Sequence, residues 1–265
     1  MSDQKFDSVH MIRTGPIGGT PVVLVHPVGL DLTYWDRQIE GLFDTYDVVA
    51  YDLPGHGDTP GAPSDWSFDN AAATLGALVT SLGRDGAHIV GISIGGMIAQ
   101  VFALRYPELV RSLVLVGTAA TFSSEARQAM RDRAETTRRE GMIGVLPSTI
   151  SRWFTPEFVA HRPDVIDRVG KTLLADDPSI HAAMWEMISC LDVAGELSRI
   201  RCPTLIMVGD LDPSCPPAAA QVLHEGIAGS LMEILPNASH MSILEQPAII
   251  NDHLSRFYAS LAHAR

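Results

Sequence analysis

The segment of residues 88–97 constrains the fold more than any other part of the chain. It joins an apolar run to an apolar, Ala-rich stretch through the pentapeptide Gly-Ile-Ser-Ile-Gly at residues 91–95. A strand that turns directly into a helix holds the central serine, Ser93, at the tip of a tight turn with its hydroxyl above the sheet. Gly91 and Gly95 fit this turn, because a Cβ at either position would clash with the backbone across it. The segment therefore predicts a strand–turn–helix unit with Ser93 as a candidate nucleophile.

Apolar runs alternate with helical patterns along most of the 265 residues. Continuous apolar runs are typical of strands buried in a parallel sheet. Such runs cover residues 21–26, 47–52, 87–91, 111–116, 204–208 and 231–235. Apolar residues at spacings of four and three predict a helix over 68–82, and a second helix is expected over 96–105. The alternation predicts an α/β fold with a mostly parallel sheet and helices on both faces.

The alternation stops between residues 121 and 197. This segment is charged, has a helical pattern and is interrupted by four prolines. An insertion between two strands of one sheet can cover the carboxyl-terminal edge, where ligands bind in open α/β sheets. We therefore predict a core of residues 1–120 and 198–265 and a helical cap of residues 121–197, inserted before the penultimate strand. A separate small helical domain elsewhere on the surface is the alternative.

Composition limits the partners and the location of the chain. The formal net charge is −12 and no basic stripe stands out, which argues against nucleic acid. The densest basic run, residues 127–139, alternates with acidic residues and is expected to form a solvent-exposed helix face. No stretch approaches the roughly 18 apolar residues of a membrane helix, and residues 1–5 lack a signal-peptide core, so we expect a cytoplasmic protein without membrane association. The three cysteines lack metal-ligand spacing and predict neither a metal site nor disulfides.

A serine nucleophile needs a base, and in this topology an acid and then a histidine follow the serine along the chain. The first strand after the cap leads into a loop with two acids, and we prefer Asp212, which a proline follows, over Asp210. The last strand leads into the loop that holds His240. We predict that His240 acts as the base for Ser93 and that Asp212 orients it. Six other histidines are expected at the surface: His10, His161, His181, His224, His253 and His263.

Two backbone N–H groups are expected to stabilise negative charge on a substrate oxygen. One is that of Ile94, which follows the serine at the N-terminus of a helix. The loop after the first apolar run supplies the other, and since Pro27 has no N–H, Val28 is the expected donor. Gly29 allows a sharp turn there, and His26 is expected to brace the loop through hydrogen bonds rather than to transfer a proton.

These motifs together resemble the α/β-hydrolase superfamily, and the likeness covers nearly the whole chain. Residues 25–29 are similar to the family's oxyanion loop, although Pro27 stands where glycine is usual. Residues 52–59 resemble the family's Gly-x-Gly-x-Ser/Thr turn, and residues 237–247 resemble its histidine loop and the start of its final helix. The resemblance implies a triad of serine, aspartate and histidine and no cofactor.

A closer likeness is to the 3-oxoadipate enol-lactonases of aromatic catabolism. It rests on residues 29–36, 91–98 and 152–158. This resemblance implies a serine hydrolase that opens a small lactone or ester through an acyl-enzyme. Other chemistry on the same triad remains open, namely ester hydrolysis, C–C bond hydrolysis, perhydrolysis or a lyase step. A non-catalytic small-molecule receptor and homo-oligomer formation are also left open.

A lactone with a free carboxylate needs a local cation in so acidic a chain. Three arginines of the cap are candidates: Arg138, Arg139 and Arg152. Aromatic and sulfur-containing side chains of the cap either line an apolar pocket or hold the cap helices together. These side chains are Trp153, Phe154, Met184 and Trp185. We expect Arg152, Trp153 and Trp185 to contact the substrate.

Overall fold

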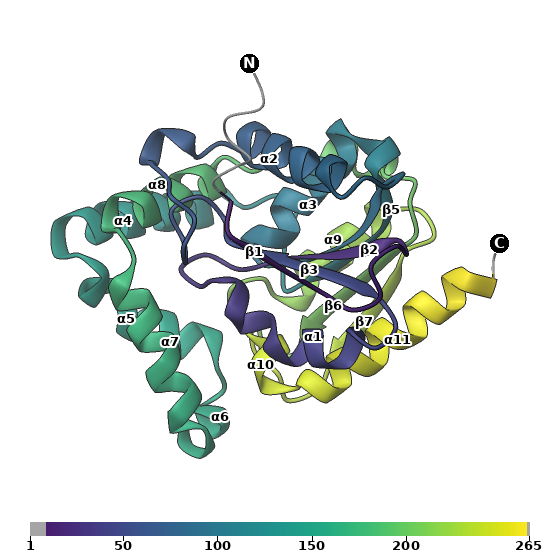
Figure 1. Cartoon of the computed structure of the whole chain (residues 1–265). Coiled ribbons are helices and arrows are strands. Elements are labelled where there is room, and N and C mark those ends of the chain that lie inside the picture. Colours follow the sequence, from purple (N-terminus) through teal and green to yellow (C-terminus); the bar gives the residue numbers. More distant parts are fainter. Residues whose placement is uncertain (1–8, 264–265) are drawn as a thin grey trace.

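The computed structural model describes the backbone of residues 9–263 and the side chains of residues 9–262. Residues 1–5, where the sequence predicts no signal peptide, lie outside the described residues. The described part contains a seven-stranded sheet in the order β1-β3-β2-β4-β5-β6-β7, with helices packed against it (Figure 1). The strands are β1 (Met11–Thr14), β2 (Pro21–Val25), β3 (Asp47–Tyr51), β4 (Ala87–Ile92), β5 (Val110–Val116), β6 (Thr204–Gly209) and β7 (Leu231–Leu235).

The six predicted strands are all present and pair in parallel. Strands β2 to β4 and β6 are buried along their whole length, in keeping with their continuous apolar runs. The carboxyl ends of these strands therefore meet at one edge of the sheet. The loops that carry Val28, Ser93, Asp212 and His240 all leave the sheet at this edge.

Strand β1 was not predicted, because it is a half-exposed edge strand without an apolar run. It pairs antiparallel with β3. Arg13 of β1 binds the buried carboxylate of Asp47 through two hydrogen bonds of 2.8 and 2.7 Å. This ion pair lowers the pKa of Asp47 and fixes the edge strand to the sheet.

Helices cover both faces of the sheet. In Figure 1, α2 and α3 lie on one face, and α1 and α11 lie on the other. Helix α3 is buried from Ile94 to Leu104, as expected of a helix that is apolar on all sides. The helices of the core are α1 (Asp36–Leu42), α2 (Phe68–Ser81), α3 (Ile94–Arg105), α9 (Pro217–Gly226), α10 (Ser242–Glu245) and α11 (Pro247–His263).

Five α-helices lie between β5 and β6, within the segment predicted to be a cap, and we call them the helical insertion. They are α4 (Ser124–Glu140), α5 (Met142–Trp153), α6 (Pro156–His161), α7 (Pro163–Ala175) and α8 (Pro178–Ser189). Three of the four prolines of this segment occupy the first position of a helix, where the missing N–H has no cost. They begin helices rather than interrupt them.

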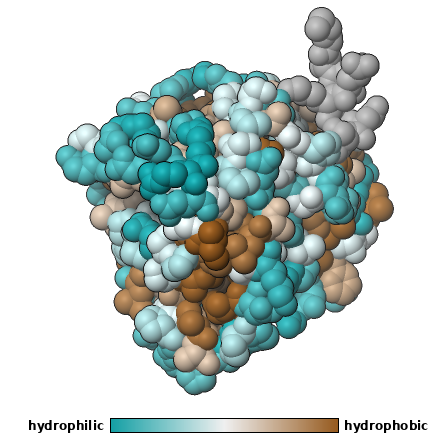
Figure 2. Space-filling view, turned by 90° about the vertical axis from the view of Figure 1, so that its left-hand side faces the viewer, coloured by the Kyte–Doolittle hydropathy of each residue, from teal (hydrophilic) through white to brown (hydrophobic). Residues whose placement is uncertain are grey.

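The helical insertion forms one side of the molecule (Figures 1 and 2). Figure 2 shows a patch of hydrophobic residues among hydrophilic ones on this side. The exposed apolar side chains of the insertion include Ile143 of α5 and Leu174 of α7. No helix of residues 9–263 is long and apolar enough to cross a membrane.

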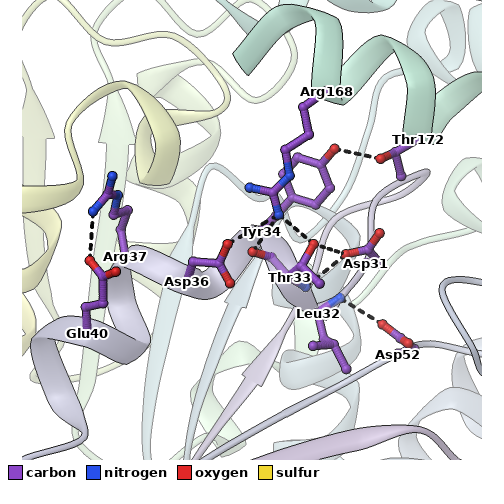
Figure 3. A network of polar contacts seen from close by, with 10 residues as sticks. All are labelled: Asp31, Leu32, Thr33, Tyr34, Asp36, Arg37, Glu40, Asp52, Arg168 and Thr172. Carbon is purple, nitrogen blue, oxygen red and sulfur yellow. Dashed lines mark hydrogen bonds and ion pairs between the residues drawn. The ribbon is translucent and has the colours of Figure 1, made fainter. Parts of the chain in front are cut away.

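Helix α7 is attached to the core through a clasp at the short 3-10 helix Leu32–Trp35 (Figure 3). The Arg168 guanidinium donates to the carbonyl oxygen of Thr33 at 3.0 Å and lies 4.4 Å above the ring of Tyr34. The hydroxyl groups of Tyr34 and Thr172 are 2.7 Å apart. The clasp holds the insertion on the segment that follows the Gly29 turn.

The expectation of a solvent-exposed basic face over residues 127–139 is wrong for two of its arginines. Arg127 donates to the carbonyl oxygens of Ser189 and Leu191 at 2.6 Å, at the C-terminal end of α8. Arg133 also turns inward. The reason is that α4 packs along α8, so one side of this charged helix faces protein rather than water.

Candidate active site

Ser93 occupies the turn between β4 and α3 with a φ of 55°, a left-handed conformation that is strained for a serine. A Cβ on Gly91 would lie 2.3 Å from the carbonyl oxygen of Gly95, and a Cβ on Gly95 would lie 2.2 Å from that of Val25. Both glycines are therefore required by the close approach of backbone, as predicted. The carbonyl oxygen of Ser93 accepts a hydrogen bond of 2.8 Å from the Thr118 hydroxyl, which fixes the turn.

Ser93, His240 and Asp212 form a hydrogen-bonded chain. The Ser93 Oγ lies 3.0 Å from His240 Nε2, and His240 Nδ1 lies 2.8 Å from Asp212 Oδ2. Since a carboxylate only accepts, the Nδ1 of His240 carries the proton and Nε2 is free to accept the serine proton. All three side chains are buried, which shields the hydrogen bonds between them from most of the solvent.

The loop after β6 distinguishes the two candidate acids. Asp212 Oδ1 accepts from the backbone N–H groups of Ser214 at 2.7 Å and Cys215 at 2.9 Å. These bonds hold the carboxylate in place. Asp210 instead accepts from the backbone N–H of Ala238 at 3.3 Å and supports the neighbouring loop. The structure thus brings Asp212, rather than Asp210, to His240.

The loop of His240 is tied to the helical insertion. The backbone N–H of Met241 donates to the carbonyl oxygen of Trp153 at 2.9 Å. Glu245 accepts from the backbone N–H of Thr155 at 2.7 Å and, with its other oxygen, from that of Ser239 at 2.5 Å. The position of His240 is therefore set jointly by the core and by the end of α5.

The backbone N–H groups of Val28 and Ile94 have no hydrogen-bond acceptor within the described residues. The side chains of both residues are buried. The loop of Val28 is braced by His26, whose Nε2 accepts from the Leu53 N–H at 2.8 Å, as the sequence predicts. Burial lowers the pKa of His26 to about 3, so its ring stays neutral and can accept this bond. Gly29 completes the turn with a φ of 72°.

A cavity of about 750 Å³ lies between the sheet edge and the helical insertion. Ser93, His240 and Val28 line it from the core. The insertion contributes polar and aromatic side chains, which include Arg133, Thr149, Arg152, Trp153 and Trp185. The three insertion residues predicted to contact the substrate therefore all reach the cavity.

Other predicted residues of the insertion lie elsewhere. Phe154 stacks on Phe158 with ring centroids 5.4 Å apart, and Met184 is fully buried, so both hold the insertion together. Arg138 pairs with Glu186, and Arg139 lies at the surface. The expectation that Arg138 or Arg139 could serve the cavity as a cation is wrong, because neither lines it.

Arg133 is a charged residue of the cavity that the sequence patterns do not identify. Its guanidinium lies 4.8 Å from the ring centroid of Trp185 and donates to Ser148 Oγ at 3.0 Å. Burial, and then the neighbouring Arg152, lowers the pKa of Arg133 to about 10, so it remains a cation at neutral pH. Within the described residues, Arg133 donates to the hydroxyl groups of Ser148 and Thr149 and Arg152 donates to the carbonyl oxygen of Pro213, so neither guanidinium is paired with a carboxylate. The signal was the helical spacing of Arg133 from Met130, which also lines the cavity.

The prediction that six further histidines lie at the surface is wrong for His181, which is only 1% exposed. His161 is exposed, whereas His10, His224 and His253 are half-buried. The side chain of His263 lies outside the described side chains. His181 is buried because α8 packs it against the turn at Gly29, a contact between distant parts of the chain. Among residues 9–263, no group of three or more His, Cys, Asp or Glu side chains could hold a metal ion.

Comparison with known proteins decides the family. A family model described as the alpha/beta hydrolase fold matches residues 20–247. The chain belongs to the α/β-hydrolase family. This hydrolase is 31% identical to 3-oxoadipate enol-lactonase 2 of Acinetobacter baylyi over 230 residues, which span 87% of this chain and 85% of the relative.

Two solved structures are similar to the hydrolase over most of their length. The enol-lactonase from Burkholderia xenovorans LB400 has a TM-score of 0.88 and 27% identity, over 95% of this chain and 96% of that chain. A thermophilic esterase from Thermogutta terrifontis, solved with malate bound, has a TM-score of 0.89 and 30% identity, over 96% and 93% of the two chains. The relatives of this hydrolase thus include enzymes that act on lactones and on esters.

Proposed function

We propose that the protein is a cofactor-free serine hydrolase that opens a small lactone, or cleaves a small ester, bearing a carboxylate. The enol-lactone of 3-oxoadipate is the substrate that we favour. The observation that carries the proposal is a cavity with the hydrogen-bonded chain of Ser93, His240 and Asp212 on its wall and two arginines without carboxylate partners. In this proposal, residues 121–197, which include the helical insertion, form a cap over the cavity.

The proposed reaction follows from the positions of the protons on Ser93 and His240. His240 Nε2 takes the proton from Ser93 Oγ as the oxygen attacks the lactone carbonyl carbon. The N–H groups of Val28 and Ile94 stabilise the resulting oxyanion. The ring C–O bond then breaks, and the proton on His240 Nε2 passes to the leaving enol oxygen. An acyl-enzyme on Ser93 remains, and a water molecule activated by His240 hydrolyses it.

Asp212 keeps the ring of His240 in the productive tautomer and stabilises the imidazolium that forms during each proton transfer. Its carboxylate can do this because the bonds from Ser214 and Cys215 already hold its second oxygen. The Asp212 charge is then directed at His240 Nδ1.

A carboxylate on the substrate accounts for the charge in the cavity. Arg133 and Arg152 line the cavity within an acidic chain. A guanidinium binds a carboxylate through strong, charge-assisted hydrogen bonds. Trp153 and Trp185 supply apolar walls for the carbon skeleton. The related esterase from Thermogutta terrifontis, solved with malate, offers a precedent for a carboxylate ligand in this family.

The test is hydrolysis of 3-oxoadipate enol-lactone by the purified protein, with Ser93→Ala as the matched variant. We expect ring opening by the wild type and a loss of at least about 10³-fold in kcat for Ser93→Ala, with an unchanged circular dichroism spectrum. Turnover of p-nitrophenyl acetate without turnover of the lactone would keep the serine hydrolase and reject the lactone. Equal activity of wild type and Ser93→Ala on both substrates would reject the mechanism.

A further inference from the structure

A cluster of buried polar groups lies where the helical insertion meets the turn at Gly29. A Cβ on Gly29 would lie 2.5 Å from Leu173, 3.1 Å from Asp176 Oδ2 and 3.3 Å from His181 Cε1. Asp176 follows the end of α7, and His181 lies in the first half of α8. These insertion residues therefore pack directly on the loop that carries the Val28 N–H.

Two atoms of this cluster have no hydrogen-bond partner among the described residues, namely Asp176 Oδ2 and His181 Nδ1. They face each other at 3.7 Å. Trp185 Nε1 donates to His181 Nε2 at 2.9 Å, and since an indole N–H only donates, the proton of the neutral ring lies on Nδ1. Burial lowers the pKa of His181 to about 3, so the ring stays neutral. A donor on His181 thus faces an acceptor on Asp176.

The core holds the same turn from another direction. The backbone N–H of Gly29 donates to His56 Nε2 at 3.2 Å, and His56 Nδ1 lies 3.2 Å from the carbonyl oxygen of Pro54. Burial lowers the pKa of His56, which keeps Nε2 available as an acceptor. The Gly29 turn is therefore held between a histidine of the core and an aspartate–histidine pair of the insertion.

Burial makes the ionised form of Asp176 unfavourable in the interior. Burial raises the pKa of Asp176 most strongly; His56 lowers it, and Asp31 and Asp177 raise it to a smaller extent. A buried group of this kind destabilises the fold when ionised, so its position against the turn calls for a functional reason.

We propose that Asp176 and His181 are positioning residues that hold the Gly29 turn, and with it the Val28 N–H, where that N–H stabilises the oxyanion. The inference rests on the proposed function. The Asp176 carboxyl group faces His181 Nδ1 at 3.7 Å, and the two side chains together pack the insertion against the turn. Asp176 follows the end of α7, and the clasp of Arg168 and Thr172 attaches α7 to the core at Thr33 and Tyr34 (Figure 3).

The test compares kcat and KM for p-nitrophenyl acetate in the full chain. Asp176→Leu removes the acceptor, and we expect it to lower kcat at least ten-fold while KM changes less than two-fold, because an oxyanion donor acts in the transition state. Asp176→Asn keeps an acceptor of the same shape and retains at least a third of kcat. Thr172→Val is the matched control, since it removes the bond to Tyr34 on the same helix and leaves kcat within two-fold.

A second readout does not depend on turnover. Amide hydrogen exchange of the segment around residues 26–32 should be at least ten-fold faster in Asp176→Leu than in wild type, and unchanged in Thr172→Val. If Asp176→Leu does not fold, Asp176→Ala removes the same acceptor and makes the same predictions.

Three results would overturn the inference: an unchanged kcat and exchange rate in Asp176→Leu, an equal loss in Thr172→Val, or a change confined to KM. Failure of the proposed function gives a different result. In that case the wild type shows no Ser93-dependent hydrolysis, and the exchange measurement alone decides whether Asp176 holds the turn.

Discussion

Replacing Asp176 by asparagine should stabilise the protein, and the gain in stability should be larger at neutral pH than at acidic pH. Burial of the side chain raises the pKa of Asp176 from 3.8 to about 6. Each unit of pKa shift corresponds to about 1.4 kcal/mol between the two protonation states, so the ionised carboxylate destabilises the fold by about 3 kcal/mol. Asparagine has a similar shape and does not ionise.

The sign follows from the raised pKa in the folded state. The folded protein binds the Asp176 proton more tightly than the unfolded chain does, so this proton stabilises the fold fully below about pH 4. That contribution is lost as the pH rises through about 6. The free energy of unfolding of Asp176→Asn, relative to wild type, should therefore rise by about 3 kcal/mol from pH 4 to pH 8.

Urea denaturation followed by circular dichroism at a series of pH values measures this difference. Asp177→Asn is a matched control, because Asp177 is adjacent and exposed, and hydrogen bonds from Ser179 lower its pKa. Its contribution has the opposite sign, so this variant should gain no stability between pH 4 and pH 8. A difference between Asp176→Asn and wild type that does not vary with pH would refute the raised pKa of Asp176.

Three further substitutions test other parts of the structure. Arg133→Met should raise KM for the carboxylate-bearing lactone about ten- to a hundred-fold, because this factor corresponds to the loss of one hydrogen bond to a charged group. KM for p-nitrophenyl acetate should stay within three-fold, and equal effects on both substrates would argue against a carboxylate site. Arg13→Met leaves the buried Asp47 carboxylate without its cation, and urea denaturation should show a loss of about 3 kcal/mol at pH 7 that shrinks toward pH 3; a loss below 0.5 kcal/mol, within the range expected at a surface site, would contradict the buried pair. Gly95→Ala forces a Cβ to within 2.2 Å of the Val25 carbonyl oxygen, so it should lower the melting temperature and reduce kcat sharply, and unchanged values would contradict the geometry of the turn.

Local patterns in the sequence were sufficient to predict the parallel strands and to place Ser93, Asp212 and His240 on loops at one sheet edge. Each of these predictions depends on a few neighbouring residues, such as the glycines that flank Ser93. Strand β1 was missed because half-exposed edge strands need no apolar run.

Arg133 and His181 could not be placed from local patterns. Arg133 lies in a helix whose charges alternate in sign, and only its packing against α8 decides which arginines face inward. His181 is buried because α8 meets the turn at Gly29, about 150 positions earlier in the chain. The side chains that adapt a common fold to its ligand are thus set by contacts between distant segments.

The two bonds of Glu245 have a consequence for the exchange of parts between relatives. One carboxylate binds the backbone N–H groups of Thr155, at the start of α6, and of Ser239, next to His240. A graft of a relative's helices onto this core keeps both bonds only if it places the backbone N–H of position 155 within reach of Glu245. The junction after α5 therefore limits which helices can be exchanged between relatives, because the carboxylate that meets this junction also holds the loop of His240.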